Sequence, residues 1–328
     1  MNAMEGISIK NVTKTYSQRI LFSKKTFNAV ENVSLDITTD PPEIFSLVGE
    51  SGSGKSTLAN MILQLIKPDI GEILLNGKKI NDFEMLEFMK KIQPIFQDPF
   101  DSFDPMKKTD LFIYETVKNF NIARNKDSIN YIIDQCLQKV GLNYQMIKGR
   151  YPHEFSGGQL QRIAIARALV VKPLFLVADE PVSMLDASLR ISIVNLFKQL
   201  KEKENLSVLY ITHDLSTAYY ISDRIGVMLR GNLVEIGNAK EILGEPLHPY
   251  TQFLMKALLE PDPDKTKISL FDNEKNEEKM TEVSEYQLKG CKYANRCPNV
   301  KKICREKNPE YYYIKNRKIK CFLYEEFK

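Results

Sequence analysis

The sequence predicts an α/β protein with a parallel, nucleotide-binding sheet, a smaller antiparallel β subdomain and a helical insertion. A glycine-rich loop at 49–57 stands between an apolar run and a helical pattern. A second apolar run, 174–181, ends in two carboxylates. Two stretches of alternating polarity, 6–16 and 28–38, precede the loop, whereas 109–140 has helical spacing. Continuous apolar runs are typical of buried parallel strands, and alternation is typical of half-buried ones.

The overall composition is that of an ordinary globular protein, but the C-terminal residues differ in charge from the rest of the chain. Of 328 residues, 43% are hydrophobic and 27% charged, as in ordinary globular proteins. No apolar run approaches the ~20 residues that cross a bilayer, and the first residues do not resemble a signal peptide. We therefore expect a cytoplasmic protein whose membrane role requires a partner. Residues 289–328 contain twelve basic and four acidic residues. This asymmetry predicts a separate C-terminal module.

The first half of the chain contains two predicted β features and one candidate base-stacking residue. The strands 6–16 and 28–38 are separated by a basic insertion, and Asn76-Gly77 predicts a tight hairpin turn. Tyr16 lies upstream of the glycine-rich loop, where an aromatic ring can stack on adenine. Phe22 and Phe27 compete for this role.

The loop GESGSGKST matches a phosphate-binding pattern, with Gly49, Gly54, Lys55 and Ser56 at its characteristic positions. Glycines let the backbone approach a polyphosphate, and the helix N-terminus adds positive partial charge. Lys55 is expected to reach the β- and γ-phosphates, and the Ser56 hydroxyl to ligate Mg²⁺. The remaining loop residues expected at the nucleotide are Ser51, Gly52 and Thr57.

Three later segments supply candidate catalytic side chains. The run LFLVADEP delivers Asp179, a candidate Mg²⁺ ligand, and Glu180, which would orient or deprotonate the attacking water. A strand predicted to end at Gln97 brings an amide that could contact Mg²⁺ or that water. His213 follows another apolar strand and could reach the γ-phosphate, although by itself such a histidine is more often a satisfied loop residue.

The segment FSGGQ precedes an amphipathic helix and predicts a second anion-binding helix start. Ser156 is expected at the N-cap, and Gly157 and Gly158 leave the backbone open to an anion. Taken alone, the segment is better interpreted as a local helix cap.

Together these motifs resemble the ATP-binding-cassette (ABC) ATPases over residues 5–260. The glycine-rich loop looks like their Walker A, LFLVADE like Walker B, and FSGGQ like the LSGGQ signature. Gln97 matches the Q-loop, Ser183–Asp186 the D-loop and His213 the switch histidine. The resemblance implies a P-loop NTPase (RecA-like) core that binds ATP with Mg²⁺ and hydrolyses it.

The resemblance also implies a composite site. Cassettes of this family dimerise head to tail, so that each ATP lies between one Walker A and the partner's signature. The signature residues would then serve the partner's nucleotide; they are Ser156, Gly157, Gly158 and Gln159. The D-loop Asp186 is also expected at a nucleotide.

A narrower resemblance is to oligopeptide/dipeptide importer ATPases, particularly the F-named subunit. It rests on IFQDPFDSFDP, YPHEFSGGQLQR, DEPVSMLD and PLHPYTQFLMKAL. The likeness to the F-named subunit rests on the long gap after Tyr16 and on the stretch KSTLANMILQLIKPDIGEI. It implies a D-named ATPase partner, two transmembrane permease subunits and an extracytoplasmic solute-binding protein, with this chain peripheral on the cytoplasmic face of the membrane. Nickel or an oligosaccharide is an alternative solute. A soluble ABC ATPase acting on nucleic acid or ribosomes is a poor alternative, and no nucleic-acid partner is expected.

The domain boundaries expected on this basis are 1–260 for the nucleotide-binding domain, with the helical insertion at about 100–155, and 261–328 for a linker and a four-cysteine module.

The module contains Cys291, Cys297, Cys304 and Cys321, spaced C-x5-C-x6-C-x16-C. Because disulfides are disfavoured in the cytoplasm, a metal is the leading physical interpretation, and four thiolates suit zinc or an iron–sulfur cluster. The importer resemblance implies a [4Fe–4S] cluster. Zinc and unliganded reduced thiols are the alternatives.

Overall fold

The computed structural model describes residues 5–20, 23–259 and 285–327. Within these ranges the chain divides into two compact units. The first contains residues 74–212 with short stretches at 5–7 and 37–44, and the second contains 8–36, 45–73 and 213–327. Most of the predicted linker and the alternative base-stacking residue Phe22 lie outside the described residues.

Three parallel strands form the sheet of the first unit, in the order β8-β7-β6. Their side chains are almost all buried, because helices cover strands of this kind on both faces. The strands are β6 (Ile92–Ile95), β7 (Phe175–Asp179) and β8 (Ser207–Thr212). The helices are α2 (Met85–Lys91), α3 (Thr109–Asn119), α4 (Lys126–Lys139), α5 (Tyr144–Ile147), α6 (Gly157–Leu169) and α7 (Ala187–Glu204), with 3-10 turns at Ile80–Asp82, Phe100–Ser102 and Pro152–Glu154.

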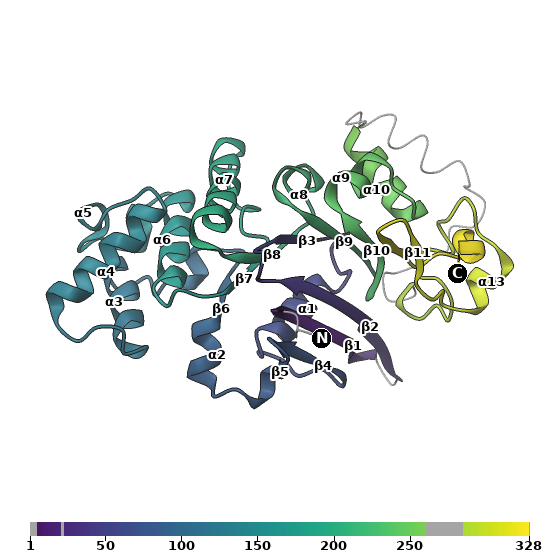
Figure 1. Cartoon of the computed structure of the whole chain (residues 1–328), viewed down its shortest axis with the longest axis horizontal. Coiled ribbons are helices and arrows are strands. Elements are labelled where there is room, and N and C mark those ends of the chain that lie inside the picture. The colour runs from purple at the N-terminus through teal and green to yellow at the C-terminus, as the bar shows by residue number, and fades with distance from the viewer. Residues whose placement is uncertain (1–4, 21–22, 260–284, 328) are drawn as a thin grey trace. The chain divides into compact units, whose positions relative to one another are not determined.

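The predicted helical insertion corresponds to α3, α4 and α5. These helices gather with α6 in one group (Figure 1). Ile113 and Val117 of α3 and Ile129, Ile133 and Leu137 of α4 are fully buried. Within each helix they recur every four residues, which places the apolar side chains of that helix on one face. The helical spacing read at 109–140 therefore predicted these elements correctly.

In the second unit the strands follow the order β11-β12-β10-β9-β3, and β3 pairs with β9 in parallel. The core includes Val48, Val227 and Leu229 from the strands and Tyr250 from α10. The strands are β3 (Ile44–Val48), β9 (Arg224–Leu229), β10 (Asn232–Asn238), β11 (Tyr312–Ile314) and β12 (Arg317–Ile319). The helices are α1 (Lys55–Ile62), α8 (Leu215–Ile221), α9 (Ala239–Gly244), α10 (Pro249–Leu259) and α13 (Lys302–Glu306), with a 3-10 segment at Phe322–Phe327.

The C-terminal residues are joined to this sheet by a hairpin. β11 pairs with β12, and β12 pairs antiparallel with β10, with Ile319 opposite Glu235. Residues 285–327 therefore belong to the same compact unit as the glycine-rich loop.

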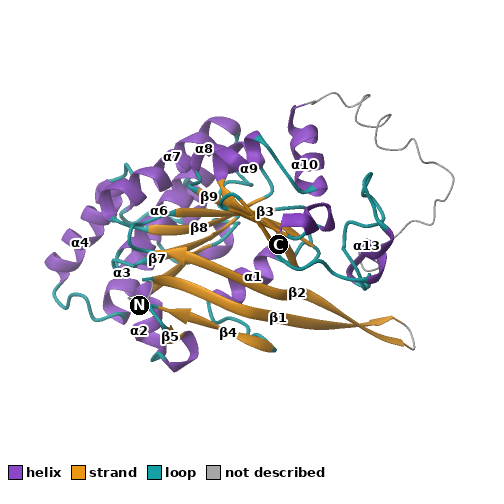
Figure 2. Ribbon diagram, turned by 45° about the vertical axis from the view of Figure 1, so that its right-hand side comes forward, coloured by secondary structure: helices purple, strands orange, loops and turns teal. Residues whose placement is uncertain are grey.

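A long antiparallel pair, β1 (Gly6–Ile20) and β2 (Ser23–Thr38), lies beside β4 (Ile70–Leu75) in the order β2-β1-β4 (Figure 2). The basic insertion at 17–27 lengthens these two strands, since β1 and β2 run into it from both sides.

The hairpin predicted at Asn76-Gly77 is present. Both residues have positive φ, 50 and 77, as a tight two-residue turn requires. The turn joins β4 to β5 (Lys78–Lys79), and Leu75 pairs with Lys78.

Candidate nucleotide site

The loop Gly49–Thr57 connects β3 to α1, so its context is strand, loop and helix. Gly49 and Gly54 have positive φ, 150 and 105, and a Cβ at either would lie 2.1 Å from a backbone oxygen. Only glycine fits at these two positions. Gly54 is also the N-cap of α1 and offers no side-chain acceptor to the helix. The loop therefore has the backbone cradle and the helix start that suit a phosphate.

Lys55 is buried, with 5% of its surface exposed. Its Nζ lies 2.9 Å from the carbonyl oxygens of Gly49 and Glu50 and 3.4 Å from Ser53 Oγ. The ammonium group is therefore held against the loop, where it places a positive charge beside the backbone cradle. A polyphosphate would be attracted to that charge.

Three candidate residues of the first unit share one sheet edge. β6 and β7 are parallel, with Ile95 opposite Ala178. Asp179 is the last residue of β7 and Glu180 follows it, whereas Gln97 lies two residues after the end of β6, so all three lie at or just beyond the carboxyl ends of adjacent strands. Ligands of parallel sheets bind at this edge.

The predicted strand boundary at Gln97 was wrong, because β6 ends at Ile95. Beyond it the backbone enters a turn in which Asp98 Oδ1 accepts a hydrogen bond of 2.8 Å from the N–H of Phe100. Gln97 is therefore an exposed loop residue.

Glu180 has a left-handed backbone conformation, with φ 45. Its N–H donates to the carbonyl oxygen of Ile211 at 2.9 Å, and its own carbonyl accepts from Ser183 Oγ at 3.0 Å. A non-glycine residue in this region costs on the order of 1 kcal/mol or more and persists where its neighbours hold it. The conformation turns the chain sharply at the end of β7, a feature that the apolar pattern did not reveal.

Ser156 caps α6 in a reciprocal arrangement. Its hydroxyl accepts from the N–H of Gln159 at 3.3 Å, and Gln159 Oε1 accepts from the N–H of Ser156 at 3.0 Å. This capping box is the local role that the sequence alone allowed. Gly157 and Gly158 form the first turn of the helix, where backbone N–H groups are available to an anion.

The turn Ser183–Asp186 lies beside the start of α6, because a Cβ on Gly157 would come within 3.3 Å of Leu185 Cδ2. Asp186 caps α7 and accepts from the N–H of Leu189 at 3.0 Å. That hydrogen bond is the main cause that lowers the pKa of the Asp186 carboxyl. The turn Ser183–Asp186 and the start of α6 are thus neighbours in the first unit.

His213 follows β8 directly and is exposed. The next residue, Asp214, caps α8 by accepting from the N–H of Ser216 at 2.9 Å.

An aromatic row in the second unit includes Tyr16 and Phe27, whose ring centroids are 6.2 Å apart. Its third member, Tyr286, lies 5.1 Å from Phe27. The Tyr286 hydroxyl donates to the carbonyl oxygen of Gly52 in the glycine-rich loop. Sequence reasoning missed Tyr286, because it lies 234 residues beyond Gly52 in a segment without a recognisable motif.

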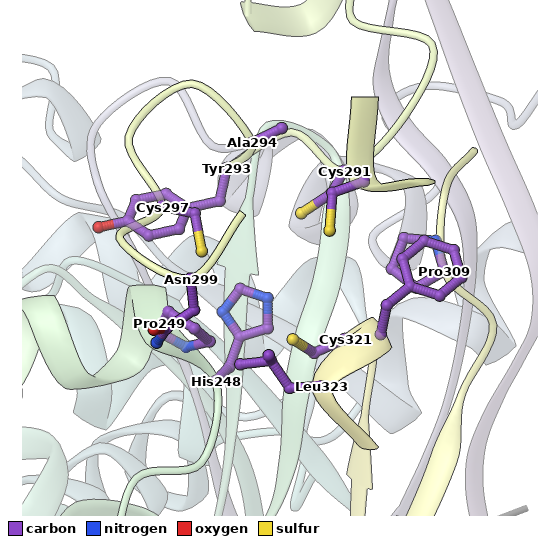
Figure 3. A pocket seen from close by; sticks show the side chains of 12 residues that line it. His248, Pro249, Cys291, Tyr293, Ala294, Cys297, Asn299, Pro309, Cys321 and Leu323 are labelled. Carbon is purple, nitrogen blue, oxygen red and sulfur yellow. The ribbon is translucent and has the colours of Figure 1, made fainter. Parts of the chain in front are cut away.

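Four thiols and His248 line a small cavity of about 10 Å³ (Figure 3). The figure shows the sulfur atoms of Cys291, Cys297 and Cys321 around the His248 ring. Burial raises the pKa of Cys291 to about 11 and that of Cys321 to about 12, and it lowers the pKa of His248 to about 3. The thiols of Cys291 and Cys321 are therefore protonated at neutral pH. Sequence reasoning did not place His248 among them.

The predicted [4Fe–4S] cluster is wrong, and the zinc alternative has no support. The described residues contain no group of three or more His, Cys, Asp or Glu side chains arranged to hold a metal ion. A cavity of about 10 Å³ has room for about one water molecule. All of the cysteines in the described residues are free.

Similar proteins were found by sequence and by structure. Residues 30–183 match the ABC transporter family, and residues 234–304 match the C-terminal region of oligopeptide/dipeptide transporters. The chain is 44% identical to the oligopeptide transport ATP-binding protein OppF of Streptococcus mutans, over 80% of this chain and 84% of that protein. It is also 44% identical to the dipeptide transport ATP-binding protein DppF of Lactococcus lactis, over 78% and 82%. These relatives are named as ATP-binding proteins, and neither name refers to an iron–sulfur cluster.

Among solved structures, the ATP-binding cassette MJ0796 in a dimer bound to ADP and Pi superposes with a TM-score of 0.62 and 32% identity. The match covers 71% of this chain and 98% of that cassette. In the part of the chain that the structure describes, no helix is sufficiently long and apolar to cross a membrane.

Proposed function

This chain belongs to the ATP-binding subunits of oligopeptide and dipeptide ABC transporters, and on that premise we propose which of its residues bind and hydrolyse ATP. It is an ATPase subunit of such an importer. The observation that carries the assignment of residues is the phosphate loop, where glycine is required at positions 49 and 54 and Lys55 is held at the cradle.

On the phosphate side, Lys55 and the loop N–H groups would bind the β- and γ-phosphates. Ser56 and Asp179, with Gln97, would hold Mg²⁺, which neutralises charge on the phosphates. The loop residues Ser51, Gly52 and Thr57 would complete the cradle. Tyr16 would stack on the adenine.

On the water side, Glu180 would orient and deprotonate the attacking water, and His213 would bind the γ-phosphate. The sharp turn at Glu180 supports this role, because strained backbone is retained where neighbouring contacts hold a functional group in place.

We further propose that the signature residues Ser156–Gln159 and Asp186 act on a nucleotide held by a second ATPase subunit. The position of Ser156–Gln159 at the N-terminus of α6 supports this, as does the dimeric state of the similar cassette MJ0796.

The test of the signature assignment is Ser156→Ala. The variant should lower ATP turnover of the assembled transporter on the order of tenfold or more, because a donor to transferring phosphate is lost. Nucleotide binding by this chain alone should not change. The control is Asn125→Ala, which removes a similar cap from α4, where Asn125 Oδ1 accepts from the N–H of Ser128 at 2.7 Å. An equal loss of turnover in both variants would mean that Ser156 acts only as a helix cap and does not contact the nucleotide.

ATP-binding subunits of oligopeptide transporters work with membrane permeases and a substrate-binding protein. We propose a D-named paralogue as the second ATPase and the cytoplasmic face of the membrane as the location. We also propose 1–260 as the nucleotide-binding domain and 261–328 as linker and tail.

Peptide uptake tests the function in cells. Deletion of the gene should abolish uptake of labelled oligopeptides, and the wild-type gene should restore it, whereas a Lys55→Ala gene should not. The same strains should take up nickel and oligosaccharides normally. If deletion removes uptake of either of these solutes and leaves peptide uptake intact, the peptide assignment fails.

A further inference from the structure

The phosphate loop is held from outside by residues of the C-terminal half of the chain. The carbonyl oxygen of Ser51 accepts from Arg230 Nη1 at 3.3 Å, and that of Ser53 accepts from the N–H of Gly231 at 2.8 Å. The carbonyl oxygen of Gly52, between them, accepts from the Tyr286 hydroxyl. Three successive loop carbonyls are thus hydrogen-bonded.

A four-membered ion-pair network lies beside these contacts. Glu50 of the loop binds Arg296 through both carboxylate oxygens, at 2.8 and 3.2 Å, and lies 3.5 Å from Arg230. Glu285 binds Arg230 at 2.7 Å and Arg296 at 3.0 Å. The side chains of Arg230 and Glu285 are only 6% and 10% exposed. Buried arginine–carboxylate pairs of this geometry are strong and directional.

The segment that carries these groups is anchored in the core of the second unit. Arg296 lies over the rings of Tyr250 and Tyr293, with its guanidinium carbon 5.9 and 5.2 Å from their centroids. Tyr250 and Tyr293 belong to the same buried cluster as Val48, the last residue of β3 before the loop. The Tyr250 hydroxyl also accepts from the N–H of Glu50 at 3.0 Å.

Peptide geometry connects these contacts to anion binding. A trans peptide is planar, so that its carbonyl and the N–H of the next residue point in opposite directions. Holding the carbonyls of Ser51, Gly52 and Ser53 fixes the orientation of the N–H groups of the residues that follow them, Gly52, Ser53 and Gly54. The N–H of Ser53 donates to the carbonyl oxygen of Glu50 at 3.2 Å, which keeps the loop closed. A phosphate cradle needs such N–H groups to be aimed before the ligand arrives.

We propose that Glu285, Tyr286 and Arg296 form a loop clamp that aligns the phosphate loop for the phosphates of ATP. The three are positioning residues, since they act through Glu50, Arg230 and the loop backbone. This inference rests on the proposed role of the loop, and it adds a function for the C-terminal segment in nucleotide affinity.

Tyr286→Phe tests the clamp with the least disturbance, because it removes one hydroxyl and keeps the ring beside Phe27. The dissociation constant for ATP should rise about three- to tenfold, the usual effect of one lost hydrogen bond, with kcat unchanged at saturating ATP. The control is Tyr313→Phe, the same change at a tyrosine that is 63% exposed in the same segment. An unchanged ATP affinity in Tyr286→Phe would overturn the clamp.

Arg296→Met and Arg296→Lys test the ion pairs. The methionine variant should weaken ATP binding on the order of tenfold, and lysine should restore part of the affinity because it keeps the charge without the bidentate geometry. The control is Arg305→Met, at an exposed arginine bonded to Asn295. Equal affinities for the methionine and lysine variants, or a matching loss in Arg305→Met, would contradict the proposal.

Competition with inorganic tripolyphosphate separates the clamp from a direct contact with the base. If Tyr286 acts through the loop, its phenylalanine variant should lose affinity for tripolyphosphate in parallel with ATP. If the variant loses affinity for ATP and keeps its affinity for tripolyphosphate, Tyr286 contacts the adenine base and the clamp is refuted. Lys55→Ala serves as the reference for the loop itself. If Lys55→Ala binds ATP normally, the assignment of the phosphate loop fails. If Lys55→Ala loses affinity for ATP and the clamp variants bind ATP normally, the loop assignment stands and only the clamp proposal fails.

Discussion

Replacement of Glu180 by glutamine is expected to lower ATP turnover by at least about 100-fold while ATP remains bound. Glutamine has the shape of glutamate but cannot accept the proton of the attacking water, and a positioned general base contributes about 10²–10⁴-fold to a rate. The left-handed backbone at Glu180 should tolerate this change, since the hydrogen bond from its N–H to Ile211 is unaffected. Phosphate release by the assembled transporter measures turnover, and equilibrium binding measures affinity.

Glu202→Gln is the matched control for this experiment. Glu202 is an exposed residue of α7, so the same loss of charge should leave turnover unchanged. A Glu180→Gln transporter that still releases phosphate at a third of the wild-type rate would remove Glu180 from the role of general base.

Replacement of Lys55 by alanine is expected to weaken ATP binding by at least about 100-fold. Contacts from an ammonium group to phosphate oxygens are charge-assisted and contribute about 1.5–3 kcal/mol each, and Lys55 is expected to make two of them. The substitution also removes the bonds from Nζ to the carbonyls of Gly49 and Glu50, so the loop loses internal support. Both effects act in the same direction.

Lys67→Ala controls for the loss of a lysine close to the same helix, because Lys67 is exposed and lies beyond the end of α1. Thermal unfolding of both variants shows whether the fold is retained. A folded Lys55→Ala protein that binds ATP as tightly as the control would contradict the assignment of the phosphate loop.

The elements that the sequence predicted best are those encoded by local spacing. The apolar run before Gly49 is a buried strand, and the helical pattern in 109–140 is the helix group of α3 and α4. The Asn76-Gly77 turn follows from the backbone freedom of two residues. In each case a few residues adjacent in the sequence determine the conformation, so a short stretch of sequence is sufficient to predict the element.

The end of the strand before Gln97 and the ligands of the expected metal site were predicted less well. The strand assigned up to Gln97 ends at Ile95, because pairing with β7 and the turn at Asp98 decide where it stops. Four cysteines in one segment indicated a metal, yet the thiols line a cavity of about 10 Å³ together with a buried histidine. Spacing along the chain does not report the geometry that a metal ion requires.

By itself, the sequence determined that this chain has a phosphate loop, a strand ending in two carboxylates and a glycine-rich helix start, because each is a short motif. Only the tertiary structure decided what surrounds the loop. Arg296 reaches Glu50 across 246 residues of the chain and Tyr286 reaches Gly52 across 234, while Glu285 holds Arg296 in place. Such contacts have no periodicity or fixed spacing, since they depend on the hairpin and core that bring the C-terminal segment to the sheet of the second unit.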